Sequence, residues 1–223
     1  MLVSSTAHAR IRRELQPHGA TLVAISKTKP IDAVLELYDE GHRDFGENRA
    51  QELAAKYKAL PRDIRWHMVG HLQTNKVKYI APFVHLIHSV DSAKVLKEIN
   101  KQAAKAGRII NVLLQFKIAQ EETKYGLEWE EAESLLSSEA FAAMENVRVC
   151  GVMGMATFTE AEAQVRREFQ KLKGYFDRLK AEFFSGDDAF REVSMGMSSD
   201  YPIALEEGST MVRIGTLLFG ERD

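Results

Sequence analysis

The chain has 223 residues, with 30 Lys or Arg and 32 Asp or Glu, so its formal net charge at pH 7 is −2. The hydrophobic fraction of 45% and charged fraction of 28% exclude a disordered or fibrous chain, and the balanced charge argues against a nucleic-acid binder. One cysteine excludes an internal disulfide, no apolar run nears the roughly 18 residues of a membrane span, and no signal-peptide pattern opens the chain. We therefore expect one cytoplasmic domain, residues 1–223.

Short apolar runs alternate with amphipathic stretches along the chain. The strands predicted from these runs are, in order, 21–27, 44–48, 66–70, 86–90, 111–118, 147–155, 192–195 and 211–216. The fifth run is apolar throughout, which is typical of a strand covered on both faces. The seventh is the weakest of the eight.

Residue types that begin or end helices separate these runs. Gly41 suits the left-handed residue that follows the first of the intervening helices. The pairs Asn48/Gln51 and Thr159/Glu162 resemble capping boxes, in which each side chain satisfies a backbone N–H of the helix it opens. The sequence therefore predicts a helix after almost every strand.

Strands that alternate with helices pair in parallel through right-handed crossovers. Eight such units in 223 residues favour a TIM (β/α)8 barrel, an α/β fold of one domain; an open doubly wound sheet is the alternative. Only seven residues follow Thr216, so we expect no full helix after strand eight. An N-terminal helix over 4–15 is expected to cover that gap.

In a TIM barrel the functional site lies at the carboxyl ends of the strands, and the loops after strands seven and eight commonly bind phosphate. Gly196 and Gly215 in these loops would let backbone N–H groups approach an anion, and Ser198 and Thr216 supply hydroxyls. Glycine and serine are also ordinary turn residues. The spacing alone therefore leaves a phosphate site and a plain turn equally open.

Lys27 closes the first apolar run, and Lys29 is an equal candidate by spacing. A lysine desolvated at such a place is a better nucleophile toward a carbonyl, whereas the alternative is a lysine that extends its ammonium to solvent. A lysine, a phosphate site and Arg213 at one end of a barrel suggest pyridoxal phosphate, whose aldehyde forms a Schiff base with lysine. Arg213 would favour an unprotonated ring nitrogen, because a guanidinium only donates.

Five segments resemble the pyridoxal phosphate homeostasis protein family, single-domain relatives of the N-terminal barrel of alanine racemase in the fold type III class. The segments are 23–30 (VAISKTKP), 45–48 (FGEN), 66–70 (WHMVG), 194–198 (SMGMS) and 208–216 (GSTMVRIGT). The resemblance extends from about Leu22 to Gly220 and implies a barrel that binds pyridoxal phosphate.

The resemblance also implies roles for single residues. Lys27, which follows the serine of the first segment, would form the Schiff base, and this favours Lys27 over Lys29. Arg213 would meet the ring nitrogen, and Asn48 would lie at the rim beside the cofactor unless it only caps a helix. The implied phosphate ligands are Ser198, Gly215 and Thr216.

Other polar residues receive weaker interpretations. His67 and His71 have a metal-ligand spacing only if both lie on one helix, and Gly70 argues against that, so no metal site is predicted. We expect His67 either to contact the residues that hold the cofactor or to be a packed histidine at a strand end. Lys124, in the loop after strand five, would approach the cofactor or lie in solvent.

An alanine racemase carries a second domain whose tyrosine acts on the opposite face of the ring, and this chain ends straight after strand eight. Racemisation needs an acid–base group on each face. The six tyrosines fit helices or outer loops, so we assign no catalytic residue.

These features favour a protein that holds pyridoxal phosphate on Lys27 and buffers or delivers it, with apo-enzymes that depend on the cofactor as recipients. A weak amino-acid racemase that uses the same cofactor is one alternative, and a cofactor-free Schiff-base barrel for sugar phosphates is another. We expect a monomer with no nucleic-acid or membrane partner, since the racemase's dimerising domain is missing.

Overall fold

The computed structural model describes residues 2–120 and 125–220 and closes eight parallel strands into a barrel in the order β1 to β8. Closure runs from the pair Thr21–Met211 to the pair Ala24–Ile214, between β1 and β8. The predicted barrel is therefore confirmed, and the open sheet is wrong. The strands are β1 Thr21–Ile25, β2 Asp44–Glu47, β3 Arg65–Met68, β4 Leu86–Val90, β5 Ile110–Gln115, β6 Val147–Met153, β7 Glu192–Ser194 and β8 Met211–Ile214.

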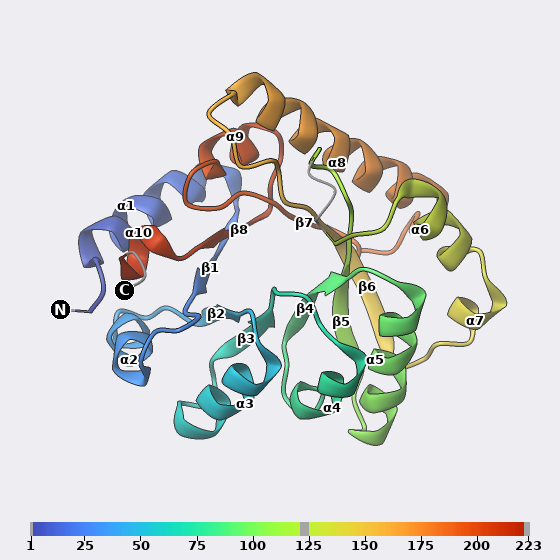
Figure 1. Cartoon of the computed structure of the whole chain (residues 1–223), viewed down its shortest axis with the longest axis horizontal. Coiled ribbons are helices and arrows are strands. Elements are labelled where there is room, and N and C mark those ends of the chain that lie inside the picture. Colours follow the sequence, from blue (N-terminus) through green and yellow to red (C-terminus); the bar gives the residue numbers. More distant parts are fainter. Residues whose placement is uncertain (1, 121–124, 221–223) are drawn as a thin grey trace.

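Helices surround the barrel (Figure 1). They are α1 Ser5–Leu15, α2 Ile31–Asp39, α3 Ala50–Ala59, α4 Val77–Ile80, α5 Ala93–Lys105, α6 Trp129–Leu136, α7 Glu139–Ala142, α8 Glu162–Glu182, α9 Tyr201–Glu206 and α10 Thr216–Phe219, with 3-10 turns η1 Gln16–His18 and η2 Thr74–Lys76. The N-terminal helix α1 packs against β1 and the four-residue α10, so it covers the gap after strand eight as expected.

Several strands and helices end or begin at other residues than the sequence predicted. The first strand ends at Ile25, two residues early, because the chain turns there. Neither capping box forms: α3 follows Arg49, and α8 follows Ala161, without a side-chain cap. The hydroxyl of Thr159 accepts the N–H of Ala161 instead, which makes a local turn ahead of the helix. The left-handed Gly41 after α2 is confirmed, with φ of 87°.

Side chains on alternate residues of each strand separate two cores. The outer core lies between strands and helices and includes Phe45, Trp66, Val112 and Phe169. The inner core fills the barrel and is small: Val23, Ile25, Val69, Leu86, Leu113, Cys150, Met153 and Met211. Met211 faces inward and Val212 outward, so the next inward position of β8 belongs to Arg213. The barrel therefore has polar side chains in its interior.

Candidate cofactor site

Lys27 lies in a turn directly after β1. The N–H of Lys29 donates to the carbonyl of Ser26 over 3.0 Å, and Thr28 between them has φ of 64°. Such a conformation suits glycine at the third residue of a turn, and in other residues it costs about 1–2 kcal/mol. The turn that carries Lys27 is therefore strained and needs support from the surrounding structure.

That support is a cluster of buried charges. The Lys56 ammonium on α3 donates to the carbonyl of Ser26 over 2.6 Å and to Oε1 of Glu47 over 2.7 Å. The Ser26 hydroxyl donates to the same Glu47 oxygen, and the N–H of Thr28 donates to Glu52 over 2.7 Å. Lys56 is 5% exposed and Glu47 is fully buried. Burial raises the pKa of Glu47, and the charge of Lys56 opposes that rise.

Arg213 lies inside the barrel and pairs by register with Val23, four residues before Lys27 on the neighbouring strand. Its Nη1 donates to the carbonyl and the hydroxyl of Ser194, over 2.8 and 2.7 Å, and its Nη2 donates to the carbonyl of Gly154 over 3.0 Å. Burial lowers the pKa of Arg213 to about 10, so it remains a cation near neutral pH. The interior thus holds a fixed positive charge below the carboxyl end of the barrel.

Two glycines let chain segments meet at that end. A Cβ on Gly215 would lie 3.2 Å from the carbonyl oxygen of Ile25, so the end of β8 touches the strand that leads to Lys27. Gly196, with φ of 95°, is tighter: a Cβ there would lie 2.7 Å from that of Ala204 on α9. The loops after β7 and β8 therefore depend on glycine for close packing.

The topology brings most of the predicted site residues to one side of the barrel end, because β2, β1, β8 and β7 are consecutive neighbours. Thr216 begins α10 and is exposed, Ser198 follows β7 and is half-buried, and Asn48 follows β2 and is half-buried. Asn48 does not cap α3, which begins at the next residue but one. The alternative prediction, that Asn48 only caps this helix, is therefore wrong.

The opposite side of the same end holds a histidine and a tyrosine. The rings of His71 and Tyr125 stack with centroids 4.0 Å apart, and Nδ1 of His71 lies 2.8 Å from Asp91. Tyr125 therefore lies at the functional end of the barrel, where the loop after strand five was expected, but its contact with His71 was not predicted. His67 is buried in the interior at 1% exposure, and Lys124 lies outside the described residues.

The chemistry of these groups is cationic and rich in donors. An amine, a buried guanidinium and two hydroxyls suit an anionic ligand that carries a carbonyl. Among residues 2–120 and 125–220, no cluster of three or more His, Cys, Asp or Glu is arranged to hold a metal ion.

The sequence did not predict the roles of Glu47, Lys56 and Ser194, although the spacing of Glu52 and Lys56 by four residues is typical of an ion pair on a helix.

Comparison with known proteins gives consistent matches. The family described as alanine racemase, N-terminal domain, matches residues 7–223. The pyridoxal phosphate homeostasis protein of Aquifex aeolicus is 44% identical over 204 residues, which are 91% of this chain and 87% of that protein. The solved structure of PipY from Synechococcus elongatus without PLP is 34% identical, with a TM-score of 0.88 over 96% of this chain and 99% of PipY. PipY with PLP bound is 33% identical by the structural match, with a TM-score of 0.86 and the same coverage of both chains.

Proposed function

The chain belongs to the pyridoxal phosphate homeostasis protein family, and we propose that it binds pyridoxal phosphate through Lys27 and acts as a buffer or carrier of the cofactor. Pyridoxal phosphate is its cofactor, and maintenance of the cofactor pool is its function. The observation that carries the assignment is the register of β1 and β8, because it pairs the buried Arg213 with β1, the strand that leads into the turn of Lys27.

The residues at the barrel end divide into four roles. Pyridoxal phosphate supplies an aldehyde that condenses with a primary amine, and Lys27 supplies that amine from its strained turn. Arg213 donates toward the ring nitrogen. Ser198 and Thr216, with the close approach that Gly215 allows, hold the phosphate. Asn48 contacts the cofactor from the rim.

A buffer fits this donor set better than an efficient enzyme does. The guanidinium of Arg213 keeps its proton and can only donate, so a ring nitrogen held by it would stay unprotonated and the ring would be a weak electron sink. Amino-acid racemisation is the second candidate, and Tyr125 at the same end of the barrel is the observation that favours it. Racemisation would need an acid such as Tyr125 opposite Lys27.

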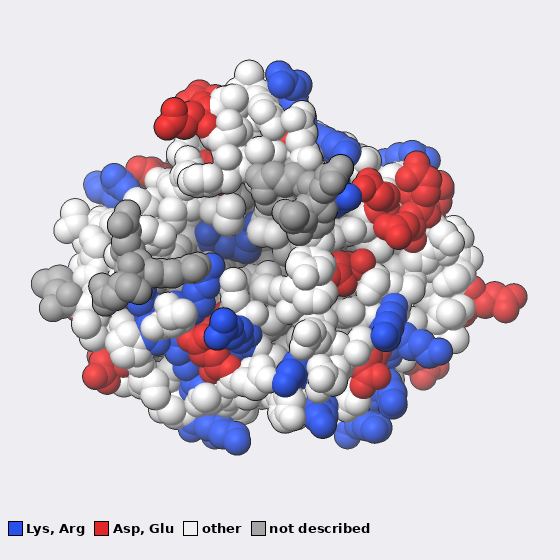
Figure 2. Space-filling view, in the orientation of Figure 1, with Lys and Arg blue, Asp and Glu red and all other residues white. Residues whose placement is uncertain are grey.

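The proposal extends to partners and location. We propose a cytoplasmic monomer that passes its cofactor to apo-enzymes that depend on pyridoxal phosphate. In the described part of the chain, none of the helices combines the length and apolar character of a membrane span. Figure 2 shows basic and acidic side chains interspersed over the visible face, without the continuous basic stripe typical of nucleic-acid binding.

Absorption spectroscopy tests the assignment of Lys27. The purified protein is mixed with pyridoxal phosphate, reduced with borohydride and digested, and the labelled peptide is identified by mass spectrometry. We expect a yellow protein with the label on Lys27, loss of the band of the attached cofactor in Lys27→Ala, and its retention in the control Lys29→Ala. A colourless wild-type protein, or a label that stays in Lys27→Ala at full yield, contradicts the proposal.

A further inference from the structure

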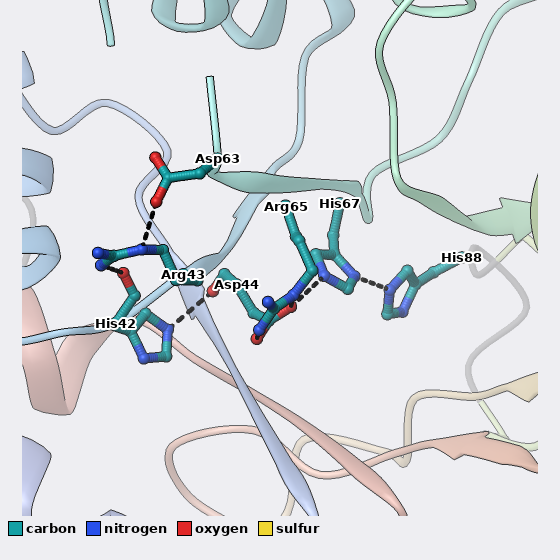
Figure 3. Close-up of polar contacts among 7 residues, drawn as sticks. All are labelled: His42, Arg43, Asp44, Asp63, Arg65, His67 and His88. Carbon is teal, nitrogen blue, oxygen red and sulfur yellow. Dashed lines mark hydrogen bonds and ion pairs between the residues drawn. The ribbon is translucent and has the colours of Figure 1, made fainter. Parts of the chain in front are cut away.

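Five polar side chains form a continuous line of hydrogen-bonding contacts across the barrel interior. From the cofactor end, Arg213 Nη1 lies 2.7 Å from Ser194 Oγ, and Ser194 Oγ lies 2.8 Å from His88 Nδ1. His88 Nε2 lies 2.9 Å from His67 Nδ1, and His67 Nε2 lies 3.1 Å from Asp44 Oδ1. Figure 3 shows the contacts of His67 with His88 and Asp44. We call these five residues the interior chain.

Elementary donor and acceptor rules give the interior chain a direction. An ionised Asp44 only accepts, so His67 donates from Nε2, and a neutral His67 then accepts at Nδ1. His88 must donate to it from Nε2 and accept at Nδ1, where only the hydroxyl of Ser194 can donate. Arg213 only donates, and it fills the acceptor side of that hydroxyl. Every donor therefore points from Arg213 toward Asp44.

The direction depends on neutral imidazoles, and the charges around the chain favour them. Arg65 donates to both oxygens of Asp44, so that carboxylate already has one cationic partner. Arg213 adds a second positive charge at the other end. A protonated His67, 1% exposed, would be a third cation for one carboxylate, and burial makes that costly.

The ionisation of the two groups beside His67 agrees with this assignment. Burial, with the positive charge of Arg213, holds the pKa of His88 well below its ordinary value, so His88 is neutral. Burial favours protonation of Asp44, but the hydrogen bonds from His67 and Arg65 outweigh it and hold the pKa of Asp44 below its ordinary value. The ring of His85 also packs against His67, with centroids 5.4 Å apart.

We infer that His88, His67 and Asp44 are positioning residues for Arg213, acting through Ser194 in a one-directional chain of two neutral imidazoles that are both protonated on Nε2. The role of Arg213 toward the ring nitrogen rests on the proposed function, whereas the direction of the chain does not. By fixing the Ser194 hydroxyl as an acceptor for Arg213, the chain holds the guanidinium in one orientation below the cofactor.

The far end of the interior chain opens at the other end of the barrel. Asp44 and Arg65 line a hollow of about 710 Å³ at the amino ends of the first strands, together with Arg12, Arg13 and Arg43. Arg43 pairs there with Asp63 over 2.8 Å (Figure 3). A substitution that alters the hydrogen bonds of Asp44 at this surface is therefore expected to alter the orientation of Arg213. The reason is that each residue of the interior chain decides which atom of the next residue donates.

Nitrogen-15 NMR of the histidine rings tests the direction without any cofactor. In the full-length apo protein near neutral pH, we expect Nε2–H and unprotonated Nδ1 for both His67 and His88. An Nδ1–H tautomer of His88, or an imidazolium at His67, overturns the inference. The same spectra recorded with pyridoxal phosphate should keep both tautomers.

Two pairs of variants test the coupling. Asp44→Asn lets an amide donate to His67, so we expect an Nδ1–H population at His88, two links away. The control Arg43→Gln breaks the ion pair with Asp63 at the same end of the barrel and should leave the His88 tautomer unchanged. Ser194→Ala should weaken pyridoxal phosphate binding by about tenfold, and Ser194→Thr, which keeps the hydroxyl, should restore it. If Asp44→Asn does not fold, the comparison of Ser194→Ala with Ser194→Thr still tests whether the hydroxyl of Ser194 supports cofactor binding.

The outcomes separate the two proposals. Correct tautomers in a protein that takes no label on Lys27 contradict the proposed function and leave the direction of the chain intact. A labelled Lys27 with reversed tautomers, or with equal affinity in Ser194→Ala and wild type, contradicts the role of the interior chain alone.

Discussion

The ammonium of Lys56 lies 2.6 Å from the carbonyl oxygen of Ser26, the residue that precedes Lys27. Through this contact, helix α3 fixes the strained turn after β1. Replacement of a buried ion pair by apolar residues is often neutral, whereas removal of one partner is strongly destabilising. The pair of Lys56 and Glu47 is therefore better explained by the position that it gives the turn than by a gain in stability.

Lys56→Met should destabilise the fold by about 3–5 kcal/mol, because it leaves the buried carboxyl of Glu47 without its cation. It should also slow labelling of Lys27 by pyridoxal phosphate, since the carbonyl of Ser26 loses its donor. Denaturant unfolding and the labelling rate measure the two effects. The matched control is Lys58→Met on the exposed side of α3, which should change stability by no more than about 0.5 kcal/mol.

The pH dependence of that variant has a definite sign. The pKa of Glu47 is already raised by burial, and the loss of Lys56 raises it further. A carboxyl with a raised pKa in the folded state contributes stability that is present at low pH and lost as pH rises. The deficit of Lys56→Met relative to wild type should therefore shrink as pH falls toward the ordinary range of glutamate, and a deficit that grows would contradict this explanation.

Gly196 and Gly174 give opposite predictions for the same substitution. Gly196→Ala places a Cβ 2.7 Å from that of Ala204 at a positive φ, so we expect a loss of about 1–3 kcal/mol and weaker binding of pyridoxal phosphate. Gly174 lies within helix α8 with open space around it, so Gly174→Ala should stabilise the protein by about 0.5–1 kcal/mol. Unfolding midpoints and cofactor titrations measure both. Equal effects at the two positions would mean that the loop after β7 is not constrained.

Two buried histidines should make the fold sensitive to mild acid. Burial lowers the pKa of His42 to about 4, and burial also holds the pKa of His88 well below its ordinary value. Below about pH 6.5 the unfolded chain binds these protons and the folded protein does not, so stability should fall by about 1.4 kcal/mol per pH unit for each histidine.

Comparison with His42→Asn isolates one of these protons, because other titrating groups contribute equally to both proteins. Denaturant unfolding between pH 5 and 7.5 gives the free energy of unfolding as a function of pH. Below about pH 6.5, its slope should be shallower in the variant by the contribution of one proton, about 1.4 kcal/mol per pH unit. Parallel slopes would show that His42 takes up its proton in the folded state.

The sequence predicts the strands well because short apolar runs alternate with amphipathic stretches, and it predicts the ends of the strands less well. β1 ends at Ile25 because the chain enters the strained turn at Thr28. Glu52 and Lys56 on α3 contact this turn at the N–H of Thr28 and the carbonyl of Ser26. Asn48 and Thr159 have the residue type of helix caps, but each of them serves a loop. Local patterns do not distinguish a cap from a loop residue when tertiary contacts decide where the helix begins.

The interior chain could be located only in part from the sequence. His88 lies two residues after Leu86 and so shares its inward face, yet β4 is buried on both faces and its pattern does not show which face is the interior. The motif residues Lys27 and Arg213 were recognisable because they resemble those of a known family. Glu47 belongs to the resembling segment 45–48 but received no role there, and Lys56 lies outside the five segments, so their contact was not predicted.

The remaining choice between a buffer and a racemase depends on Tyr125. Its ring stacks on His71 at the functional end of the barrel, and Asp91 contacts the same histidine. A racemase would use such a group as acid opposite Lys27, yet Arg213, in the role proposed for it, would make the ring a weak electron sink. We therefore expect turnover of L- and D-amino acids well below about 1 per second. Circular dichroism and exchange of the α-hydrogen in deuterated water measure it. Faster turnover that Tyr125→Phe abolishes, while Lys27 still takes its label, would establish the enzyme and overturn the buffer.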